Sequence, residues 1–299
     1  MIERKVAFLL LATFLLPLAG VGSVAQTKKE EPAQPIRQID HVLIKTSDPK
    51  YLYSFFTDTL QLPIAWPIAT YNGFTSGGVA FGNVNIEVIR FAGTNDSPHD
   101  GRIQAQLVGF AFEPSPLADS LRELERRGVT HGTPEPYLST GPDGSKKRLW
   151  TTVTLLQFTD QVTEIFLCEY NPSFINAEDN REQLRRQLLS RKGGPLGVES
   201  VKEILFGTTD LEKARRLWQQ LLESLPTARG VWKVGNGPAI RLVEARENAI
   251  QGIIVNVKSL SRARTFLKQK GLLGHSSPHE VAIDPSKVKG LSIKLVAST

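Results

Sequence analysis

The strongest constraint on how this chain folds is an order of elements that recurs along it. Residues 39–46 alternate like a strand, and residues 49–60 place their apolar side chains on one helical face. Short strands follow around residues 64–68, 75–81 and 84–91, so the first module has the order strand, helix, three strands. Similar modules begin near residues 106, 201 and 252. Because repetition of one order indicates repeated supersecondary units, the sequence predicts four tandem modules.

Local signals at the ends of the predicted elements agree with this order. Asp48 follows the first strand and is a helix-capping residue, while Pro49 suits the first turn of a helix. Thr209-Asp210 repeats the capping signal before the helix of the third module. The same signal in two modules supports the prediction of a repeated fold.

The repeats divide the chain into two halves joined by a connector. We expect an N-terminal domain over residues 36–170 and a C-terminal domain over residues 199–299, each made of two modules. Residues 171–198 interrupt the pattern and contain a polar helix at 177–192 with a thin leucine stripe. We interpret this segment as a helical connector. Its basic face either binds an anionic partner or is a solvated helix surface.

The beginning of the chain has the composition of a secretory signal peptide over residues 1–25. A basic start precedes an apolar run at residues 6–18, and residues 23–25 are small, as at a cleavage site. The alternative is a single membrane anchor, but the run is short for a span and Pro17 interrupts its end. We therefore expect an exported protein, periplasmic or secreted, with no membrane segment in its mature form. Residues 26–35 are charged and contain proline, which predicts a flexible tether.

Composition limits the classes of partner. The chain has 299 residues, of which 40% are apolar, enough for two ordinary domains. Its one cysteine, Cys168, rules out an internal disulfide. The net charge is +6, but the Lys and Arg residues are scattered with few aromatic residues among them, which argues against a nucleic-acid role. The expected partner is a small-molecule ligand or substrate, and both a monomer and a homodimer agree with four modules in one chain.

Three side chains in the first two modules are candidate metal ligands. His41 lies in the opening strand, Glu87 in Ile-Glu-Val-Ile near the end of the first module, and Glu164 in Thr-Glu-Ile-Phe near the end of the second. Alternate residues of a strand face one side, so an imidazole and carboxylates on paired strands converge on one concave face. Such donors suit a divalent ion. The alternatives are a strand-end histidine held by hydrogen bonds and two glutamates in surface salt bridges.

Four modules of this order, opening with Asp-His-Val and closing on Ile-Glu-Val, resemble the vicinal oxygen chelate superfamily of glyoxalase, bleomycin-resistance and extradiol dioxygenase proteins. The resemblance covers about residues 36–170 well and 199–296 more loosely. It implies an α+β fold in which four tandem βαβββ modules form two half-open mixed β-barrels with helices outside. It also implies a divalent ion held by the first and last strand of each module, to which two neighbouring substrate oxygens bind.

In terms of this resemblance, His41 and Glu87 are the metal ligands of module one, and Glu164 is that of module two. The remaining position, on the first strand of module two, falls on Leu107, which cannot bind a metal. Gln106 could, but the strand pleat should turn it the other way.

The second half departs further from the pattern of ligands. The matching positions hold Glu203 and Arg241 in module three, and Gly252 and Lys294 in module four. An arginine and a lysine repel a cation. We therefore expect a degenerate C-terminal site that docks an anionic group or serves as scaffold.

These features predict an exported metal-dependent enzyme that acts on a small oxygenated compound by isomerase, lyase or dioxygenase chemistry. The ion would polarise a carbonyl, enol or hydroxyl oxygen, and Glu164 or Glu87 would move a proton as general base. The donors tolerate zinc, manganese, iron, nickel or cobalt, and no other cofactor is expected. Further candidates for the pocket lining are Tyr71, Asn72, Arg90, Arg148 and Trp150.

The alternative is a non-catalytic protein on the same fold that binds or sequesters a small molecule. The apolar residue at position 107 and the cation-repelling positions of the second half favour it. Ligand binding that survives a chelator would distinguish it from the enzyme. A third hypothesis is a scaffold that uses the helix at 177–192 to engage a partner.

Overall fold

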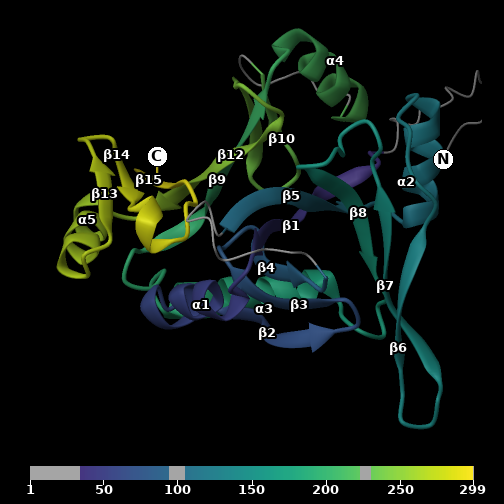
Figure 1. Ribbon diagram of the computed structural model, residues 1–299, viewed down its shortest axis with the longest axis horizontal. Coiled ribbons are helices and arrows are strands. Elements are labelled where there is room, and N and C mark those ends of the chain that lie inside the picture. The colour runs from purple at the N-terminus through teal and green to yellow at the C-terminus, as the bar shows by residue number, and fades with distance from the viewer. Residues whose placement is uncertain (1–33, 94–104, 223–229, 299) are drawn as a thin grey trace, which may run out of the picture. The chain divides into compact units, whose positions relative to one another are not determined.

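Two mixed β-sheets carry the described part of the chain (Figure 1). The computed structural model describes residues 34–93, 105–222 and 230–298, and all of them belong to one compact unit. The predicted signal peptide and nearly all of the predicted tether lie outside the described residues. Within these ranges, none of the helices combines the length and the apolar character that crossing a bilayer requires.

The first two modules build the first sheet. Module one contains β1 (Ile36–Thr46), α1 (Pro49–Ser54), η1 (Phe55–Thr59), β2 (Ile64–Tyr71), β3 (Phe74–Ala80) and β4 (Asn85–Phe91). Module two contains β5 (Ala105–Pro114), α2 (Leu117–Arg126), β6 (Glu135–Thr140), β7 (Lys146–Thr154) and β8 (Glu164–Tyr170). The strands lie in the order β2-β3-β4-β1-β5-β8-β7-β6. β1 and β5 pair antiparallel at the centre, and each pairs in parallel with the last strand of its own module.

The later modules build the second sheet, after the connecting helix α3 (Ala177–Ser190). The elements are β9 (Val198–Thr208), α4 (Leu211–Leu222), β10 (Val231–Lys233), β11 (Ala239–Glu244), β12 (Ala249–Val257), α5 (Leu260–Gln269), β13 (Leu273–Ser276), β14 (Glu280–Ile283), η3 (Pro285–Lys287) and β15 (Ile293–Ala297). Their order is β10-β11-β9-β12-β15-β14-β13, and β9 and β12 are again the antiparallel central pair. This shared pairing pattern confirms the predicted α+β class and the tandem modules.

The two sheets share one hydrophobic core. Trp218 of α4 is 1% exposed and stacks on Phe110 of β5, with ring centroids 6.1 Å apart. Its ring also meets Phe158 and Phe206 edge-on, at 4.8 and 5.6 Å. Truncating such a ring to alanine typically costs about 3–5 kcal/mol, so this contact is one of the strong links between the halves.

The turn between β3 and β4 is a second link. Val201 N donates to Asn83 Oδ1 at 2.9 Å, and Asn83 Nδ2 donates to Val201 O at 3.0 Å. Gly82 has a φ of +92°, and a Cβ there would lie 2.1 Å from the carbonyl oxygen of Glu199. Only glycine fits this position, because the turn needs both a left-handed backbone and room for β9.

The first helix differs from its prediction in winding. A single α-helix was expected over residues 49–60, and Asp48 does cap it, accepting from Tyr51 N at 3.1 Å. The α-helical part is short, however, and the chain continues as the π-helical turn η1, in which Leu60 N donates to Phe55 O at 3.0 Å. The predicted apolar face is buried all the same.

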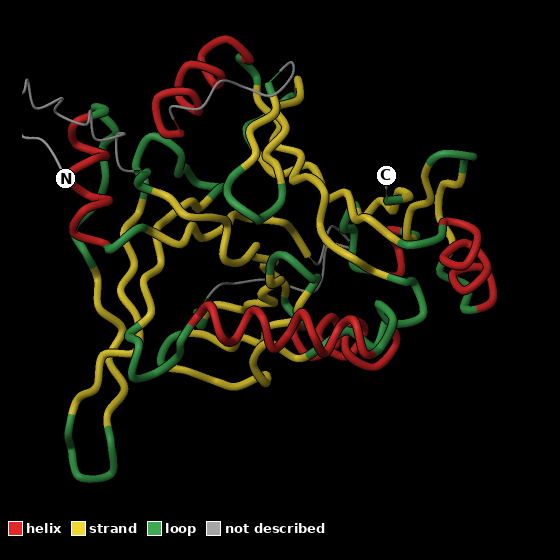
Figure 2. The backbone as a smooth tube through the Cα atoms, turned by 180° about the vertical axis from the view of Figure 1, so that it is seen from behind, coloured by secondary structure: helices red, strands yellow, loops and turns green. Residues whose placement is uncertain are grey.

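The connecting helix lies against both halves. α3 contacts β3 of the first sheet and β9 of the second (Figure 1, Figure 2). Leu184 and Leu188 are buried, so the thin leucine stripe is the face that packs. Asn176 caps the helix by accepting from Glu178 N at 3.2 Å.

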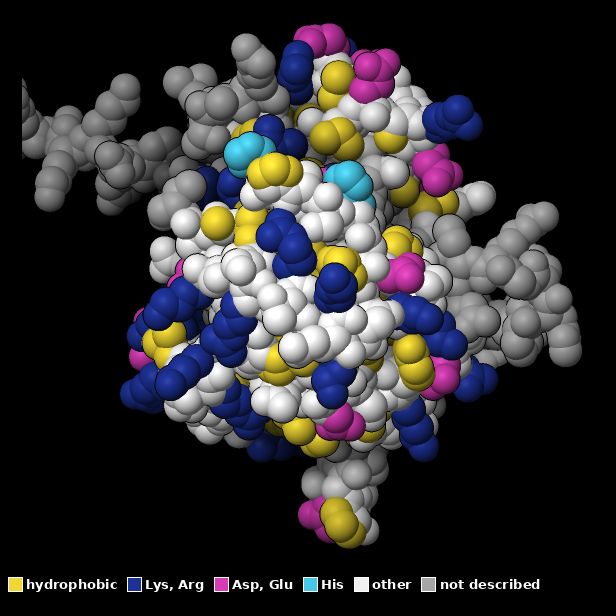
Figure 3. Space-filling view, turned by 90° about the vertical axis from the view of Figure 1, so that its left-hand side faces the viewer, with side chains coloured by type: hydrophobic (Ala, Val, Ile, Leu, Met, Phe, Trp, Pro, Cys, Tyr) yellow, Lys and Arg dark blue, Asp and Glu magenta, His cyan; other side chains and the backbone are white. Residues whose placement is uncertain are grey.

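Lys and Arg side chains are spread over the face shown in Figure 3, with fewer Asp and Glu among them. Much of this positive charge comes from the fourth module, because residues 258–294 contain eight Lys or Arg and two Asp or Glu. The net positive charge of the chain therefore arises largely outside the first sheet.

Candidate functional site

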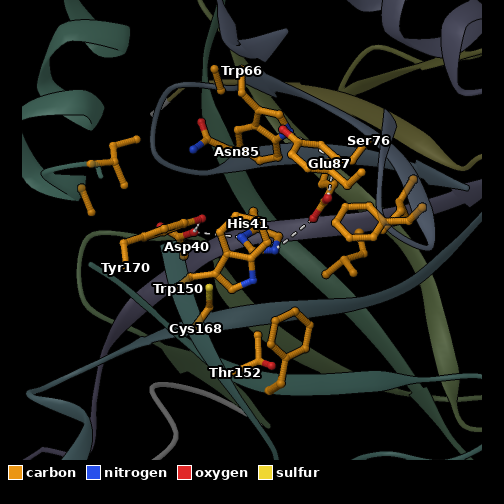
Figure 4. A pocket seen from close by; sticks show the side chains of 18 of the residues that line it. Asp40, His41, Trp66, Ser76, Asn85, Glu87, Trp150, Thr152, Cys168 and Tyr170 are labelled. Atoms are coloured by element: carbon orange, nitrogen blue, oxygen red, sulfur yellow. Dashed lines mark hydrogen bonds and ion pairs between the residues drawn. The ribbon is translucent and has the colours of Figure 1, made fainter. Parts of the chain in front are cut away.

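A pocket opens on one face of the first sheet (Figure 4). Its volume is about 230 Å³. A dry cavity of about 150 Å³ already holds benzene, so this pocket has room for one substituted ring. Strands of both modules and the start of α3 contribute to it. Its aromatic lining residues are Trp66, Tyr71, Phe74, Phe91, Trp150, Phe166, Tyr170 and Phe174.

His41 lies in this pocket between two carboxylates. The ring is 5% exposed, with Nδ1 2.8 Å from Asp40 Oδ2 and Nε2 3.2 Å from Glu87 Oε2. Burial by itself would lower the pKa of His41, but the hydrogen bonds to Asp40 and Glu87 outweigh it and raise the pKa to about 10. The imidazole is therefore fixed in orientation at both nitrogens.

Asp40 is the carboxylate that holds the far side of this ring. Tyr170 donates its hydroxyl to Asp40 Oδ2 at 3.0 Å, and Arg181 Nη1 lies 3.3 Å from Oδ1. Burial opposes ionisation, but His41, Arg181 and Tyr170 together hold the pKa of Asp40 below its ordinary value. Asp40 is thus an ionised, buried carboxylate that orients His41.

A β-bulge explains how two consecutive residues reach one pocket. In a regular strand Asp40 and His41 would face opposite sides of the sheet. The pairing of β1 with β5 shifts between Ile39 and His41, which leaves Asp40 as the extra residue. Bulges re-aim side chains in this way and are frequent beside functional sites. The sequence prediction, which used strict alternation, did not include Asp40.

Glu87 is held from two sides. Its Oε2 faces His41, and its Oε1 accepts a hydrogen bond from Ser76 Oγ. Ser76 in turn accepts from Trp66 Nε1 at 3.1 Å. The carboxylate is therefore positioned by the hydroxyl of β3 and the imidazole of β1.

Glu164 lines the same pocket from β8 but is bound to nothing in it. Among the described residues its carboxylate has no hydrogen bond and no ion pair. Burial, followed by the negative charge of Glu87, raises the pKa of Glu164. It is a half-buried carboxylate with a lone pair available toward the pocket.

The three predicted ligands are therefore brought to one pocket, with His41 and Glu87 in contact and Glu164 separate from them. Across residues 34–298, apart from the gaps stated above, no group of three or more His, Cys, Asp or Glu side chains is close enough to hold a metal ion. The residue types suit a divalent ion, but only the His41–Glu87 half of a site is assembled.

The first-strand ligand position of module two was predicted to be Leu107. This residue belongs to the large hydrophobic core and does not lie on the pocket face. Val108 and Ala111 of β5 lie behind the pocket with Phe166, and Gly109 is beside Glu164 in the strand pairing. The irregular pairing of β5 with β1 shifts the parity that the prediction assumed. None of these side chains carries a donor atom.

Of the five residues predicted to line the pocket, Tyr71 and Trp150 do so. Asn72, Arg90 and Arg148 are exposed and do not line it. Cys168 is buried and lines the pocket.

The connector supplies residues that the sequence did not predict for the site. Phe174, Ile175 and Arg181 all line the pocket. Arg181 Nη2 is also 2.8 Å from Glu113 Oε2, so one guanidinium joins two carboxylates of the first sheet. Nothing in the local sequence distinguishes Arg181 from its neighbours on the helix.

The corresponding positions of the second sheet carry ion pairs. Glu203 and Arg241 bind each other, and Lys294 Nζ lies 3.3 Å from Glu280 Oε1. In the second sheet Ile293 pairs with Ile253, at the place where Ile165 pairs with Phe110 in the first sheet. The next residue, Lys294, therefore occupies the position of Phe166 and not that of Glu164. The predicted match of Lys294 to Glu164 was therefore two residues off.

No protein-family model matches the sequence, and no curated protein matches it. Solved structures do share its fold. A variant of 4-hydroxymandelate synthase from Streptomyces coelicolor matches with a TM-score of 0.58 at 11% identity, over 88% of this chain and 93% of that one. A hypothetical protein from Staphylococcus aureus matches with a TM-score of 0.57 at 10% identity, over 87% and 99%. Homoprotocatechuate 2,3-dioxygenase from Arthrobacter globiformis matches with a TM-score of 0.53 at 12% identity, over 90% and 82%.

Identities this low show the fold alone. The chain has the fold of the vicinal oxygen chelate superfamily, to which extradiol dioxygenases and 4-hydroxymandelate synthase belong. This confirms the resemblance drawn from the repeated order of elements.

Proposed function

We propose that this protein is a metal-dependent enzyme that transfers a proton on a small oxygenated compound, by isomerase or lyase chemistry. The observation that carries the proposal is the chain Asp40–His41–Glu87. An imidazole whose Nδ1 is held by a buried carboxylate, and whose Nε2 faces the pocket, is the usual arrangement of a metal-binding histidine and its orienting partner.

The donor set fits a divalent ion. His41 and Glu87 would hold it, and Glu164 is the third donor available in the pocket. The 3.2 Å between Nε2 and Oε2 is close to the separation of two ligands that each lie about 2.0–2.2 Å from one ion. A cation would also offset the repulsion between Glu87 and Glu164, which otherwise share a poorly solvated pocket.

The residues of the chain would divide the work of catalysis. The ion, when bound, would polarise a carbonyl or hydroxyl oxygen of the substrate. Glu164, with its raised pKa and no hydrogen bond to a described residue, is suited to take up and return a proton as general base. Asp40 would keep His41 in one tautomer and orientation, and the aromatic lining would exclude water and align the substrate.

The donors favour proton transfer over oxygenase chemistry. Non-haem iron oxygenases typically use two histidines and one carboxylate. This pocket offers one histidine and the carboxylates Glu87 and Glu164, so oxygen donors predominate. Such a set suits an ion that acts as a Lewis acid without changing its oxidation state.

The test is the metal content of the purified protein before and after dialysis against a chelator. We expect close to one divalent ion per chain, lost with the chelator and restored on reloading. His41→Ala should abolish it, and Asp40→Asn should weaken the affinity about 10–100-fold. His131→Ala is the matched control, because His131 bonds to Gly132 O outside the pocket. Undiminished metal in His41→Ala would overturn the proposal.

A second candidate is a non-catalytic binding protein. The observation that favours it is that both ring nitrogens of His41 already face carboxylates, so the imidazole has partners without an ion. This version predicts that a small-molecule ligand raises the melting temperature equally before and after chelation. A ligand-induced rise in melting temperature that becomes smaller on chelation would favour the enzyme.

Export is a separate proposal that rests on residues 1–25 of the sequence. It predicts that protein recovered outside the cytoplasm begins near Gln26. Amino-terminal sequencing of that fraction tests it, and an intact leader on exported protein would contradict it.

A further inference from the structure

The charges and the unpartnered polar groups of the pocket together indicate the kind of ligand that it takes. We propose that the pocket selects an uncharged compound of one aromatic ring, and that the carboxamide of Asn85 recognises the polar substituent of that ring. The inference deepens the proposed function, since it concerns the same pocket, but it does not depend on a bound ion.

The positive charge in the pocket is already neutralised. Among the described lining residues, Arg181 carries the permanent positive charge, against the carboxylates Asp40, Glu87 and Glu164. A divalent ion bound beside a neutral imidazole would add two positive charges and bring the balance only to zero. An anionic ligand would lose its hydration in the pocket and gain no free counter-charge.

Arg181 is the group on which an anion would otherwise depend, and it is engaged. Its guanidinium lies 2.8 Å from Glu113 and 3.3 Å from Asp40, and its side chain is 20% exposed. Both carboxylates are mostly buried, so releasing the guanidinium to a ligand would take a counter-charge from each of them. Arg181 therefore serves the pocket wall and not the ligand.

Asn85 offers the opposite kind of group. It is 7% exposed, lines the pocket from β4, and lies level with His41 in the parallel pairing of β1 and β4 (Figure 4). No described residue forms a hydrogen bond with its carboxamide. Its amide atoms are not fully enclosed, so they are open to the pocket, where a bound molecule can take the place of water. An amide both donates and accepts, which suits an uncharged carbonyl, hydroxyl or amide substituent.

The walls around these groups are aromatic. Tyr71 and Phe74 stack on each other at 4.9 Å, and Tyr137 and Trp150 stack at 4.3 Å with their planes 2° apart. The two stacks meet edge-on, with Phe74 6.0 Å from Tyr137 and Tyr71 6.4 Å from Trp150. They come from the β2–β3 and β6–β7 hairpins at the two ends of the sheet. Of these four rings, Tyr71, Phe74 and Trp150 line the pocket, and a volume of about 230 Å³ limits the ligand to one ring.

The test compares benzamide with benzoate, two rings of nearly equal shape that differ in charge. Trp66 and Trp150 line the pocket, so tryptophan fluorescence of the chelator-treated protein reports binding. We expect benzamide to bind and benzoate to bind about tenfold more weakly or worse. Benzoate binding as tightly as benzamide, or neither compound binding at millimolar concentration, would overturn the proposal.

Variants test separately the role of the Asn85 carboxamide and the role of the pocket charge. Asn85→Leu removes the amide at nearly constant shape and should weaken benzamide about fivefold to tenfold while leaving toluene unchanged. Asn72→Leu, at an exposed position outside the pocket, should change neither. Equal losses for benzamide and toluene, or no loss for either, would remove Asn85 from the recognition. Glu164→Gln should narrow the preference for benzamide over benzoate, and an unchanged preference would contradict the argument from charge.

The outcome of the fluorescence titration does not depend on whether the protein binds a metal ion. The fluorescence titration contains no ion, so a protein that binds no metal still gives a full set of affinities. Conversely, a protein that fails to bind benzamide can still show metal that depends on His41. The two failures are therefore distinguishable.

Discussion

Glu203 accepts two hydrogen bonds from the guanidinium of Arg241, at 2.6 Å from Nε and 2.7 Å from Nη2. The pair occupies the positions that His41 and Glu87 hold in the first sheet, because β11 pairs with β9 in the register in which β4 pairs with β1. One backbone arrangement thus presents an imidazole and a carboxylate in one sheet and a bidentate ion pair in the other. The second pair supplies its own counter-charge, and we expect it to bind no cation.

The two members of this pair should not be equally sensitive to substitution. The side chain of Glu203 is 8% exposed, whereas that of Arg241 is 39% exposed. Arg241→Met leaves a buried carboxylate unpaired and should cost about 2–3 kcal/mol of unfolding free energy. Glu203→Gln still accepts a hydrogen bond, and the freed guanidinium reaches water, so about 1 kcal/mol is expected. Urea unfolding of both variants measures the difference, and equal costs would contradict this account.

The repeated order of elements made the fold predictable from the sequence. Periodicity and the cap at Asp48 are local signals, and both survive in the structure. The π-helical turn after α1 was not predictable, because the face that periodicity detects is buried with either winding. The contact of the β3–β4 turn with β9 was not predictable either, since it depends on how the halves meet.

The candidate site was predictable only where strands are regular. His41 and Glu87 follow strict alternation and meet as expected. Asp40 enters the pocket through a bulge, and alternation counts it on the other side. Arg181 enters because α3 folds back over the first sheet, a tertiary event with no local signal. Leu107 was misplaced by the irregular pairing of β5.

Arg181 should contribute measurably to stability, unlike the arginines on the outer face of the same helix. Arg181→Leu takes one counter-charge from Asp40 and one from Glu113, although His41 still binds Asp40, and Arg37 and Gln38 still bind Glu113. Because the guanidinium is mostly buried, we expect a loss of about 2 kcal/mol in unfolding free energy.

Arg185→Leu is the matched control for this change. Its side chain is 55% exposed and pairs with Glu182 on the same helix. Such surface pairs contribute at most about 0.5 kcal/mol, so the variant should unfold almost as the parent does. Equal destabilisation by the two substitutions would mean that α3 itself, and not the contact of Arg181, carries the effect.

The contact between α2 and α4 should make stability depend on pH in the acid range. Glu123 is bound by Arg126 and Arg127, and Arg127 Nη1 also donates to Leu221 O at 2.7 Å. The hydrogen bonds from Arg126, opposed by burial and joined by the hydrogen bond from Arg127, lower the pKa of Glu123 to about 2. A lowered carboxyl pKa stabilises the folded state above the unfolded pKa of about 4.5, and this stability is lost as the pH falls toward 2.

The expected size of this effect is about 2–3 kcal/mol, for a carboxylate that is 10% exposed. Glu123→Gln should therefore unfold more easily at pH 7 and show a flatter dependence of unfolding free energy on pH between about 4.5 and 2. Glu135→Gln, at an exposed position on β6, serves as the control. An unchanged slope in Glu123→Gln would exclude this carboxylate as the acid-sensitive group.

Gly109 should be indispensable for the position of Glu164. A Cβ at residue 109 would lie 1.7 Å from the carbonyl oxygen of Glu164, so alanine there must push β8 away from β5. The obstacle is backbone in a central pair of strands and cannot be relieved by a rotamer change. We expect Gly109→Ala to lower the unfolding free energy by at least about 3 kcal/mol and to distort the pocket as β8 moves. Gly132→Ala, where the nearest atom would be 3.8 Å away, should cost less than about 1 kcal/mol. Urea unfolding of the two variants at pH 7 measures both, and a mild effect of Gly109→Ala would show that the β5–β8 pairing is looser than the strand register requires.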